Sequence, residues 1–133
     1  IVELDGQKLL DGGVADSIPL KYFQQMGYDK NIVVLTQCKG YRKKPQKSWV
    51  AKMFYKKYPR FVDTLLNRHL QYNQTLEEVE SAAQAGEIFL LRPSKDLQIG
   101  RMERDPARLE AQYNLGRKDA LAALPALKEW LKK

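Results

Sequence analysis

The stretch Asn31-Ile32-Val33-Val34-Leu35-Thr36 decides the fold class, because it is an uninterrupted run of strand-forming apolar residues. A second run of this kind, Glu87-Ile88-Phe89-Leu90-Leu91-Arg92, is closed by Pro93. Continuous apolar strands of this length are typical of a parallel sheet that is covered on both faces. Most of the remaining chain carries helical patterns. The two runs therefore predict an α/β fold with a short, mostly parallel sheet and helices in the majority.

The residues before the first run predict a hairpin and a short helix. Asp5-Gly6 is a turn pair within residues 2–10, with apolar residues on both sides. Ile18-Pro19-Leu20 begins a helix that Gly27 ends. The strand of the hairpin, this helix and the strand at 31–36 together predict a βαβ unit.

The residues after the first run predict a series of amphipathic helices. Ser48 caps one helix, which breaks at Tyr58-Pro59, and a second carries an apolar stripe that ends at Leu70. Further helices are expected from the capping box at 75–78 to Gly86, from Asp105-Pro106 to Gly116, and from 117 to 133 with an interruption at Pro125. We therefore expect a single domain, residues 1–133, with a partial three-layer α/β/α arrangement. Residues 1–45 would form the βαβ segment, and residues 46–133 a helical region with a strand near 87–92.

Positive charge is concentrated in one window of the chain. The 133 residues carry a net charge of +7, and ten basic residues lie between Lys30 and Arg60. No acidic residue lies between Asp29 and Asp63. A local cationic patch of this kind favours an anionic partner, such as phosphate head groups, nucleic acid or an acidic protein surface.

Several classes of protein are excluded by composition. The strongly apolar runs 32–35 and 88–91 are far shorter than the roughly 20 residues that span a bilayer. The first residues show no signal peptide, and the single Cys38 cannot form a disulfide within the chain. One cysteine and one histidine, His69, make no metal-ligand cluster, so we expect no metal and no cofactor. The expected location is the cytoplasm, with peripheral contact to a membrane.

The motif that points most sharply to chemistry is Asp11-Gly12-Gly13 within the stretch 9–20. Asp-Gly-Gly on its own is a tight turn. A carboxylate that follows a parallel strand, however, lies at the edge of the sheet where α/β proteins place their sites. Asp16 is expected to cap the helix that follows, with a second catalytic acid as the alternative.

These residues resemble a known family. Asp11-Gly12-Gly13, then Asp16-Ser17-Ile18-Pro19-Leu20 and the strand at 31–36 are similar to the second half of the patatin-like phospholipases. Residues 1–45 carry the stronger similarity. The stretches 89–94 and 100–116 are similar, more loosely, to the tail of bacterial members.

The resemblance implies a serine acyl hydrolase with a Ser-Asp dyad. Asp11 stands at the position of the catalytic aspartate, and Gly12 and Gly13 stand at its loop. The implied substrates are acyl esters or phospholipids. A hydroxyl is a weak nucleophile until a base lies within hydrogen-bond reach, and a carboxylate can serve as that base.

The sequence departs from the family in two respects. Its serines are Ser17, Ser48, Ser81 and Ser94, and none lies in a Gly-x-Ser-x-Gly motif. A glycine-rich oxyanion loop is also absent, and the chain begins without Met. We therefore expect the carboxyl-terminal part of a hydrolase, inactive alone and partnered by an amino-terminal half that carries the serine.

A second candidate site is the basic, aromatic stretch from Tyr41 to Phe61. Its candidate contacts to an anionic surface are Lys43, Lys44, Lys52, Lys56 and Arg60. The last three are spaced by four residues, as on one helical face, and aromatic residues interleave with them. The alternative to a membrane contact is a solvated face over a core helix. No nucleic-acid motif accompanies the charge, so nucleic acid is not the expected partner. A non-catalytic module that binds anionic surfaces is the rival function.

Overall fold

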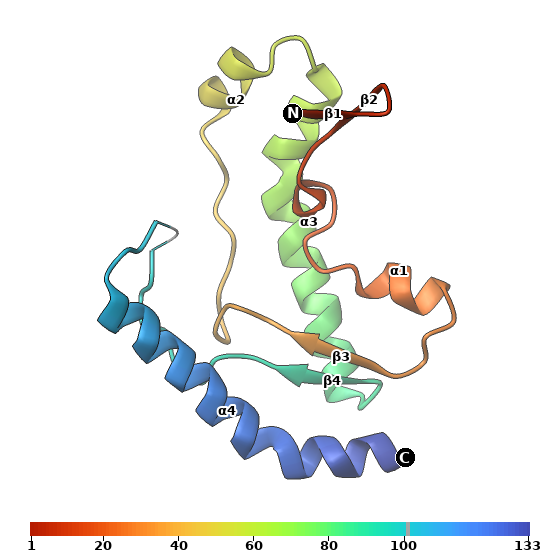
Figure 1. Cartoon of the computed structure of the whole chain (residues 1–133). Helices are drawn as coiled ribbons and strands as arrows, with labels where there is room; N and C mark the ends of the chain where they lie inside the picture. Colours follow the sequence, from red (N-terminus) through yellow and green to blue (C-terminus); the bar gives the residue numbers. More distant parts are fainter. Residues whose placement is uncertain (101) are drawn as a thin grey trace. The chain divides into compact units, whose positions relative to one another are not determined.

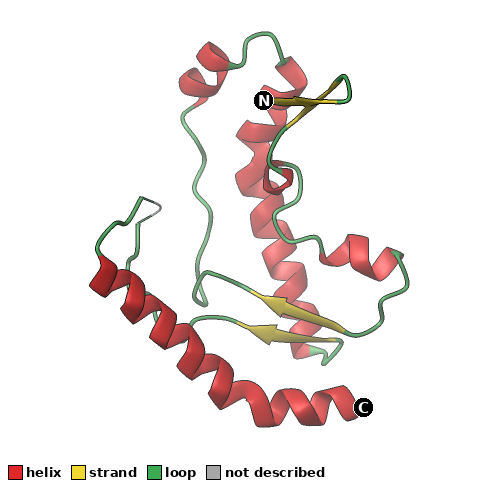
Figure 2. Cartoon of the chain, viewed as in Figure 1, coloured by secondary structure: helices red, strands yellow, loops and turns green. Residues whose placement is uncertain are grey.

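The computed structural model describes residues 1–100 and 102–133, without the side chains of Ser48, Val50 and Ala51. Arg101, within the segment that is similar to the bacterial tails, lies outside the described residues. Helices make up 51% of the chain and strands 11%, which confirms an α/β fold with helices in the majority. The elements are β1 (Val2–Leu4), β2 (Gln7–Leu9), the 3₁₀ turn η1 (Gly12–Val14), α1 (Leu20–Gln25), β3 (Asn31–Val34), α2 (Ser48–Phe54), α3 (Pro59–Gln84), β4 (Ile88–Leu91) and α4 (Pro106–Lys132) (Figures 1 and 2).

The chain forms two compact units that alternate along the sequence. The first unit comprises Ile1–Tyr22 and Arg42–Glu78, and the second comprises Phe23–Tyr41 and Val79–Lys133. Each unit is therefore built from two separate stretches of sequence.

The first unit begins with the predicted hairpin. β1 and β2 pair antiparallel, with Val2 opposite Leu9 and Leu4 opposite Gln7. Asp5 and Gly6 both have positive φ, at 50° and 73°. Two consecutive positive φ angles are the geometry of a type I′ turn, for which Asp-Gly is a preferred pair. The turn chemistry that the sequence predicted is therefore present.

This hairpin corrects the predicted βαβ unit. Within the described part of the chain, β1 and β2 form a sheet of their own, and the parallel partner of β3 is β4. The tight turn pairs β2 with its own neighbour β1 and makes it an antiparallel strand. The prediction that Asp11 follows a strand of the parallel sheet is therefore wrong.

A single long helix, α3, replaces the two predicted helices between Pro59 and Gly86. Thr75 lies in its interior, so the prediction of a helix start there is wrong. No helix-breaking residue stands between Leu70 and Thr75, and adding residues to an existing helix is far easier than starting a new one. Val62 and Leu76 on α3 are buried, as is Leu20 at the start of α1.

The second unit contains the parallel sheet. β3 and β4 pair in register from Asn31 opposite Ile88 to Val34 opposite Leu91. Leu35, Val79 and Ile88 are buried. The Trp130 ring of α4 lies 6.0 Å from the ring of Phe89, so α4 covers the face of β4 that carries Phe89. The strands predicted at 31–36 and 87–92 are confirmed, each slightly shorter.

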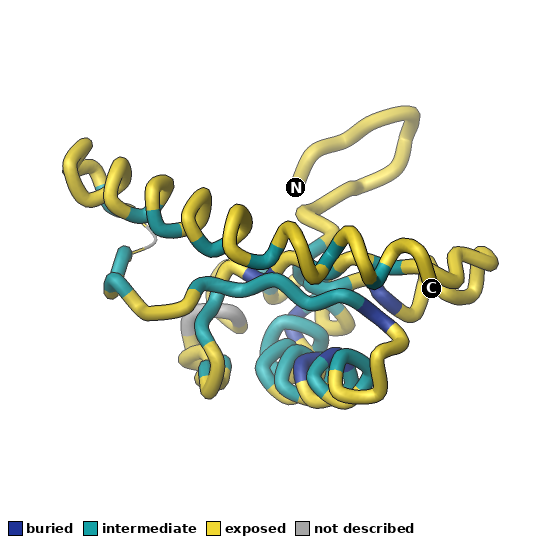
Figure 3. The backbone as a smooth tube through the Cα atoms, turned by 90° about the horizontal axis from the view of Figure 1, so that it is seen from below, coloured by how far each residue is buried: buried dark blue, intermediate teal, exposed yellow. Residues whose placement is uncertain are grey.

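The α4 helix continues through Gly116 and Pro125, where the sequence predicted an end and an interruption. Its predicted start is confirmed, because the Asp105 side chain accepts a hydrogen bond from Ala107 N at 3.0 Å. Half-buried positions recur along one side, at 112, 115, 119, 123, 127 and 130. Packing along this side offsets the roughly 1 kcal/mol by which glycine disfavours a helix. Figure 3 shows the opposite side of α4, like the hairpin, in the colour of exposed residues.

A helix that crosses a bilayer needs roughly 20 predominantly apolar residues. Within residues 1–100 and 102–133, no helix combines the length and the apolar character needed to cross a bilayer.

Candidate functional site

The Asp11 carboxylate is held in a small loop and remains open to solvent. Asp11 precedes η1, and its Oδ1 accepts a hydrogen bond from Gly13 N at 2.9 Å. Its backbone oxygen accepts a second bond, from Val14 N at 3.0 Å. Asp11 itself is exposed. Among the described residues, none bonds its Oδ2 oxygen. The loop therefore fixes one carboxylate oxygen and leaves the other available.

The two glycines of the motif have different roles. A Cβ on residue 13 would lie 3.2 Å from Asp11 Oδ1 and 3.6 Å from Arg68 Nη2. A Cβ on residue 12 would meet nothing within 4 Å. A side chain at position 13 would thus push the Asp11 carboxylate by a few tenths of an ångström, whereas the space around position 12 accepts a side chain.

Arg68 is a site residue that the sequence analysis missed. It comes from α3, and its Nη2 donates to Ser17 Oγ at 3.3 Å. Ser17 Oγ in turn donates to Gly13 O at 2.6 Å. Arg68 Nε is buried and has no hydrogen-bond partner among the residues that the structure describes. Arg68 lies three residues after Leu65 and four before Tyr72, on the half-buried side of α3, and this spacing could have marked it.

The loop thus brings a carboxylate and a guanidinium to the same glycine. A carboxylate held through one oxygen can accept a proton from a hydroxyl that approaches the other. The guanidinium adds a fixed positive charge beside it. No further acid, base or nucleophile of this chain is bonded to Asp11 in the described part.

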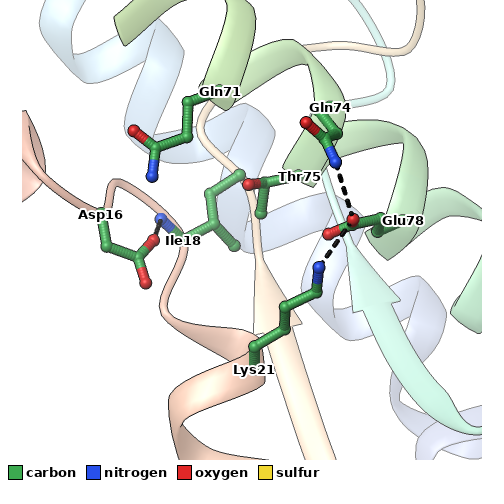
Figure 4. Close-up of a pocket in the computed structure, with 7 residues that line it drawn as sticks. All are labelled: Asp16, Ile18, Lys21, Gln71, Gln74, Thr75 and Glu78. Atoms are coloured by element: carbon green, nitrogen blue, oxygen red, sulfur yellow. Dashed lines mark hydrogen bonds and ion pairs between the residues drawn. The ribbon is translucent and has the colours of Figure 1, made fainter. Parts of the chain in front are cut away.

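Asp16 forms a local turn before α1 and does not cap the helix, contrary to the prediction, because its partner Ile18 precedes the first helical residue, Leu20. Its Oδ1 accepts from Ile18 N at 3.1 Å, which turns the chain towards α1. It also lines a polar pocket of about 220 Å³ in the first unit. The other lining residues, shown in Figure 4, are Ile18, Lys21, Gln71, Gln74, Thr75 and Glu78.

An ion pair joins two of the charged residues of this pocket. Lys21 Nζ lies 2.7 Å from Glu78 Oε1, and Gln74 Nε2 donates to the same oxygen at 3.4 Å (Figure 4). The Lys21 hydrogen bond holds the pKa of Glu78 below its ordinary value of 4.5. Asp11 does not line the pocket. The pocket lies between the start of α1 and α3, and the Asp16 carboxylate, which accepts from Ile18 N, lines it beside the ion pair.

The basic stretch divides into charges that pack on α3 and charges that face solvent. Lys43 N donates to Asn73 Oδ1 at 2.8 Å, and Asn73 Nδ2 donates back to Lys43 O at 3.1 Å. The Lys43 ammonium lies 4.5 Å from the centre of the Tyr72 ring, a cation–π geometry. Lys43 therefore anchors this stretch to α3, whereas Lys44 beside it is exposed.

Lys52, Lys56 and Arg60 do not share a helical face, so the prediction from their spacing is wrong. Lys52 is in α2, Lys56 lies between helices and Arg60 is in α3. The corner between the helices is fixed by an edge-to-face contact of Tyr55 and Phe61, whose centroids are 4.8 Å apart. A spacing of four residues marks a face only in an unbroken helix.

The remaining candidate residues have local structural roles. His69 Nδ1 lies 2.8 Å from Leu66 O of its own helix. Cys38 is half-buried and lines a pocket of about 170 Å³ in the second unit. Across the residues that the structure describes, no three His, Cys, Asp or Glu side chains gather into a possible metal site.

Fold and site together define a small α/β protein with a parallel strand pair and a solvent-exposed carboxylate loop. Residues 58–132 match the family described as "Domain of unknown function (DUF6363)". This match covers more than half of the chain, which therefore belongs to that family. It includes α3, β4 and α4, and leaves out the Asp11 loop and α2. No curated protein and no solved structure matches the chain.

Proposed function

We propose that this chain is the carboxyl-terminal part of a serine lipid acyl hydrolase, with Asp11 as the base of a Ser-Asp dyad. The serine is supplied from outside these 133 residues, which contain no Gly-x-Ser-x-Gly motif. The substrates are acyl esters or phospholipids, and the proposed place of action is the cytoplasm, at a membrane surface. The main structural support is the Asp11 carboxylate, which Gly13 N holds at 2.9 Å through one oxygen only.

The chemistry assigned to Asp11 is proton transfer. As the serine hydroxyl attacks the acyl carbonyl, its proton passes to the open carboxylate oxygen of Asp11. The Gly13 N–H group restrains the carboxylate, so that little orientation is lost when the hydroxyl arrives. No metal or cofactor takes part in this proposal.

The test labels the nucleophile directly. The full-length gene product, as wild type and as Asp11→Asn, is treated with a fluorescent alkyl phosphonate, and the labelled peptide is identified. Asparagine still accepts from Gly13 N but is not a base, so the fold is kept and the chemistry removed. We expect labelling of a serine upstream of Ile1 in the wild type and its loss in Asp11→Asn.

A matched control is Asp16→Asn, which alters a neighbouring carboxylate and keeps the bond to Ile18 N. This variant should label like the wild type. A folded wild-type protein that takes no label, or equal labelling of Asp11→Asn, would exclude the dyad.

The rival function is non-catalytic binding to an anionic surface. It is favoured by the exposed cations of residues 44–60. The two functions differ in what Asp11→Asn does: it abolishes ester hydrolysis under the first and changes nothing under the second. Charge reversal at Lys52 and Lys56 removes all activity only under the second.

A further inference from the structure

The α2 helix exposes large apolar side chains to solvent. Trp49, Met53 and Phe54 are 62%, 59% and 70% exposed. Trp49 and Met53 are one helical turn apart and share a side of α2, and Phe54, the last residue of the helix, lies about 100° further round it. A helix in a water-soluble protein normally turns its apolar side towards the core. This side of α2 is instead left uncovered by the described residues.

Exposed cations surround these side chains. Lys44 and Lys47 precede α2, Lys52 lies within it, and Lys56, Lys57 and Arg60 follow it; all are exposed. Within the described part of the chain, none of these six side chains has an ion-pair partner. Arg42 and Lys43 differ, because they contact Glu77 and Tyr72 of α3. The absence of any acid between Asp29 and Asp63 leaves the cluster unneutralised.

We propose that α2 docks on the surface of an anionic lipid bilayer. In this arrangement Trp49, Met53 and Phe54 enter the boundary between head groups and acyl chains, and the lysines lie over the phosphates. Cations alone would suit any polyanion. An uncovered apolar side between cations needs an apolar phase beside a negative surface, and a bilayer supplies both. Nucleic-acid phosphates would attract the cations but supply no apolar phase for Met53.

The geometry of α2 suits a helix that lies in the plane of the interface. Seven residues of helix extend only about 10 Å, far less than the bilayer core. Lysine side chains can extend along the apolar side chains and keep their ammonium groups in water. This inference does not rest on the hydrolase proposal, since α2 contains no residue of the proposed dyad.

The test uses the full-length gene product and sedimentation with vesicles. One set is phosphatidylcholine alone and the other is phosphatidylcholine mixed with phosphatidylglycerol. We expect binding to the mixed vesicles only. Lys52→Gln with Lys56→Gln should weaken it roughly 25-fold, about fivefold for each charge. Trp49→Ala with Phe54→Ala should weaken it about tenfold, through lost apolar burial.

The matched control for charge is Lys118→Gln with Lys128→Gln on α4, which removes the same charge from exposed positions elsewhere. This variant and Asp11→Asn should bind like the wild type. A folded Asp11→Asn protein that binds vesicles but takes no phosphonate label would show that membrane docking by α2 does not depend on the proposed dyad.

Hydrogen exchange of the backbone amides locates the contact. Peptides that cover residues 48–57 should gain protection with mixed vesicles and not with neutral ones, whereas peptides of α4 should not change. Vesicle binding that survives the Trp49 and Phe54 substitutions would overturn the inference. Strong protection of residues 48–57 without vesicles would overturn it too, because another protein segment would then cover α2.

Discussion

Asp11 Oδ1 accepts a 2.9 Å hydrogen bond from Gly13 N, and the room for this bond exists because residue 13 has no side chain. A Cβ there would lie 3.2 Å from the same oxygen. That separation is tighter than ordinary van der Waals contact, so the carboxylate would have to move. The orientation of the Asp11 carboxylate thus depends on which residue occupies position 13.

The first prediction is that Gly13→Ala displaces the Asp11 carboxylate. Because a misplacement of about 1 Å costs about 100-fold in rate, a shift of a few tenths of an ångström should slow phosphonate labelling of the full-length protein several-fold. Gly12→Ala is the control, since its Cβ would meet nothing within 4 Å. Labelling rates of both variants measure the effect. Equal rates for the two would show that the close approach at residue 13 is not required.

The parts of the fold that local chemistry determines could be predicted from the sequence. The Asp5-Gly6 turn, the strands around Val33 and Leu90 and the Asp105 cap each depend on a few neighbouring residues. Helix ends could not be predicted in the same way. The capping pattern at Thr75 and the breaker at Gly116 lie inside continuous helices. The preceding helical turns and the packing along one helical side outweigh these local preferences.

The candidate site was predictable only where it is contiguous in sequence. Asp11, Gly12 and Gly13 form one loop, as the motif implied. Arg68 reaches that loop from α3, more than fifty residues further along the chain, and only the folded structure brings it there. The expected face of Lys52, Lys56 and Arg60 failed because α2 ends at Phe54, which leaves Lys56 outside both helices. The exposure of Trp49 and Phe54 depends on what packs on α2, which periodicity does not reveal.

The second prediction concerns two leucines of α3. Leu76 is 1% exposed, whereas Leu70 is 59% exposed, although the apolar pattern placed Leu70 on the buried stripe. Leu76→Ala removes buried methyl groups and leaves a cavity, so it should cost about 2–5 kcal/mol of unfolding free energy. Leu70→Ala should change this free energy by less than about 0.5 kcal/mol. Urea unfolding of both variants measures the difference, and equal losses would contradict the burial of Leu76.

The third prediction concerns the pH dependence of the Lys21–Glu78 pair. The pKa of Glu78 is lower in the folded protein than its ordinary 4.5, chiefly because Lys21 donates a hydrogen bond to the carboxylate. A lowered pKa in the folded state stabilises the fold above the unfolded value. This contribution is lost as the pH falls from 4.5 through the folded pKa of Glu78.

Replacing the lysine tests this assignment. In Lys21→Met the Glu78 pKa should rise towards 4.5, as measured by an NMR titration of its carboxyl carbon. Lys118→Met, on α4, is the control and should leave the titration unchanged. An unchanged Glu78 midpoint in Lys21→Met would mean that the 2.7 Å contact does not persist in solution.

The fourth prediction concerns Asn73, whose side chain makes two hydrogen bonds to the backbone of Lys43. Asp at this position could still accept from Lys43 N, but it could not donate to Lys43 O and would place a negative oxygen beside that carbonyl. Losing one bond and creating this repulsion should cost about 1–2 kcal/mol of unfolding free energy. Asn67→Asp, on an exposed position of the same helix, makes the same chemical change without these partners and should cost little.

Urea unfolding gives the cost, and amide exchange at residues 43 and 44 shows whether the loss is local. Faster exchange of the Lys43 amide in Asn73→Asp, but not in Asn67→Asp, would establish that Asn73 anchors the segment that leads to α2. Equal exchange in the two variants would assign that role to another residue.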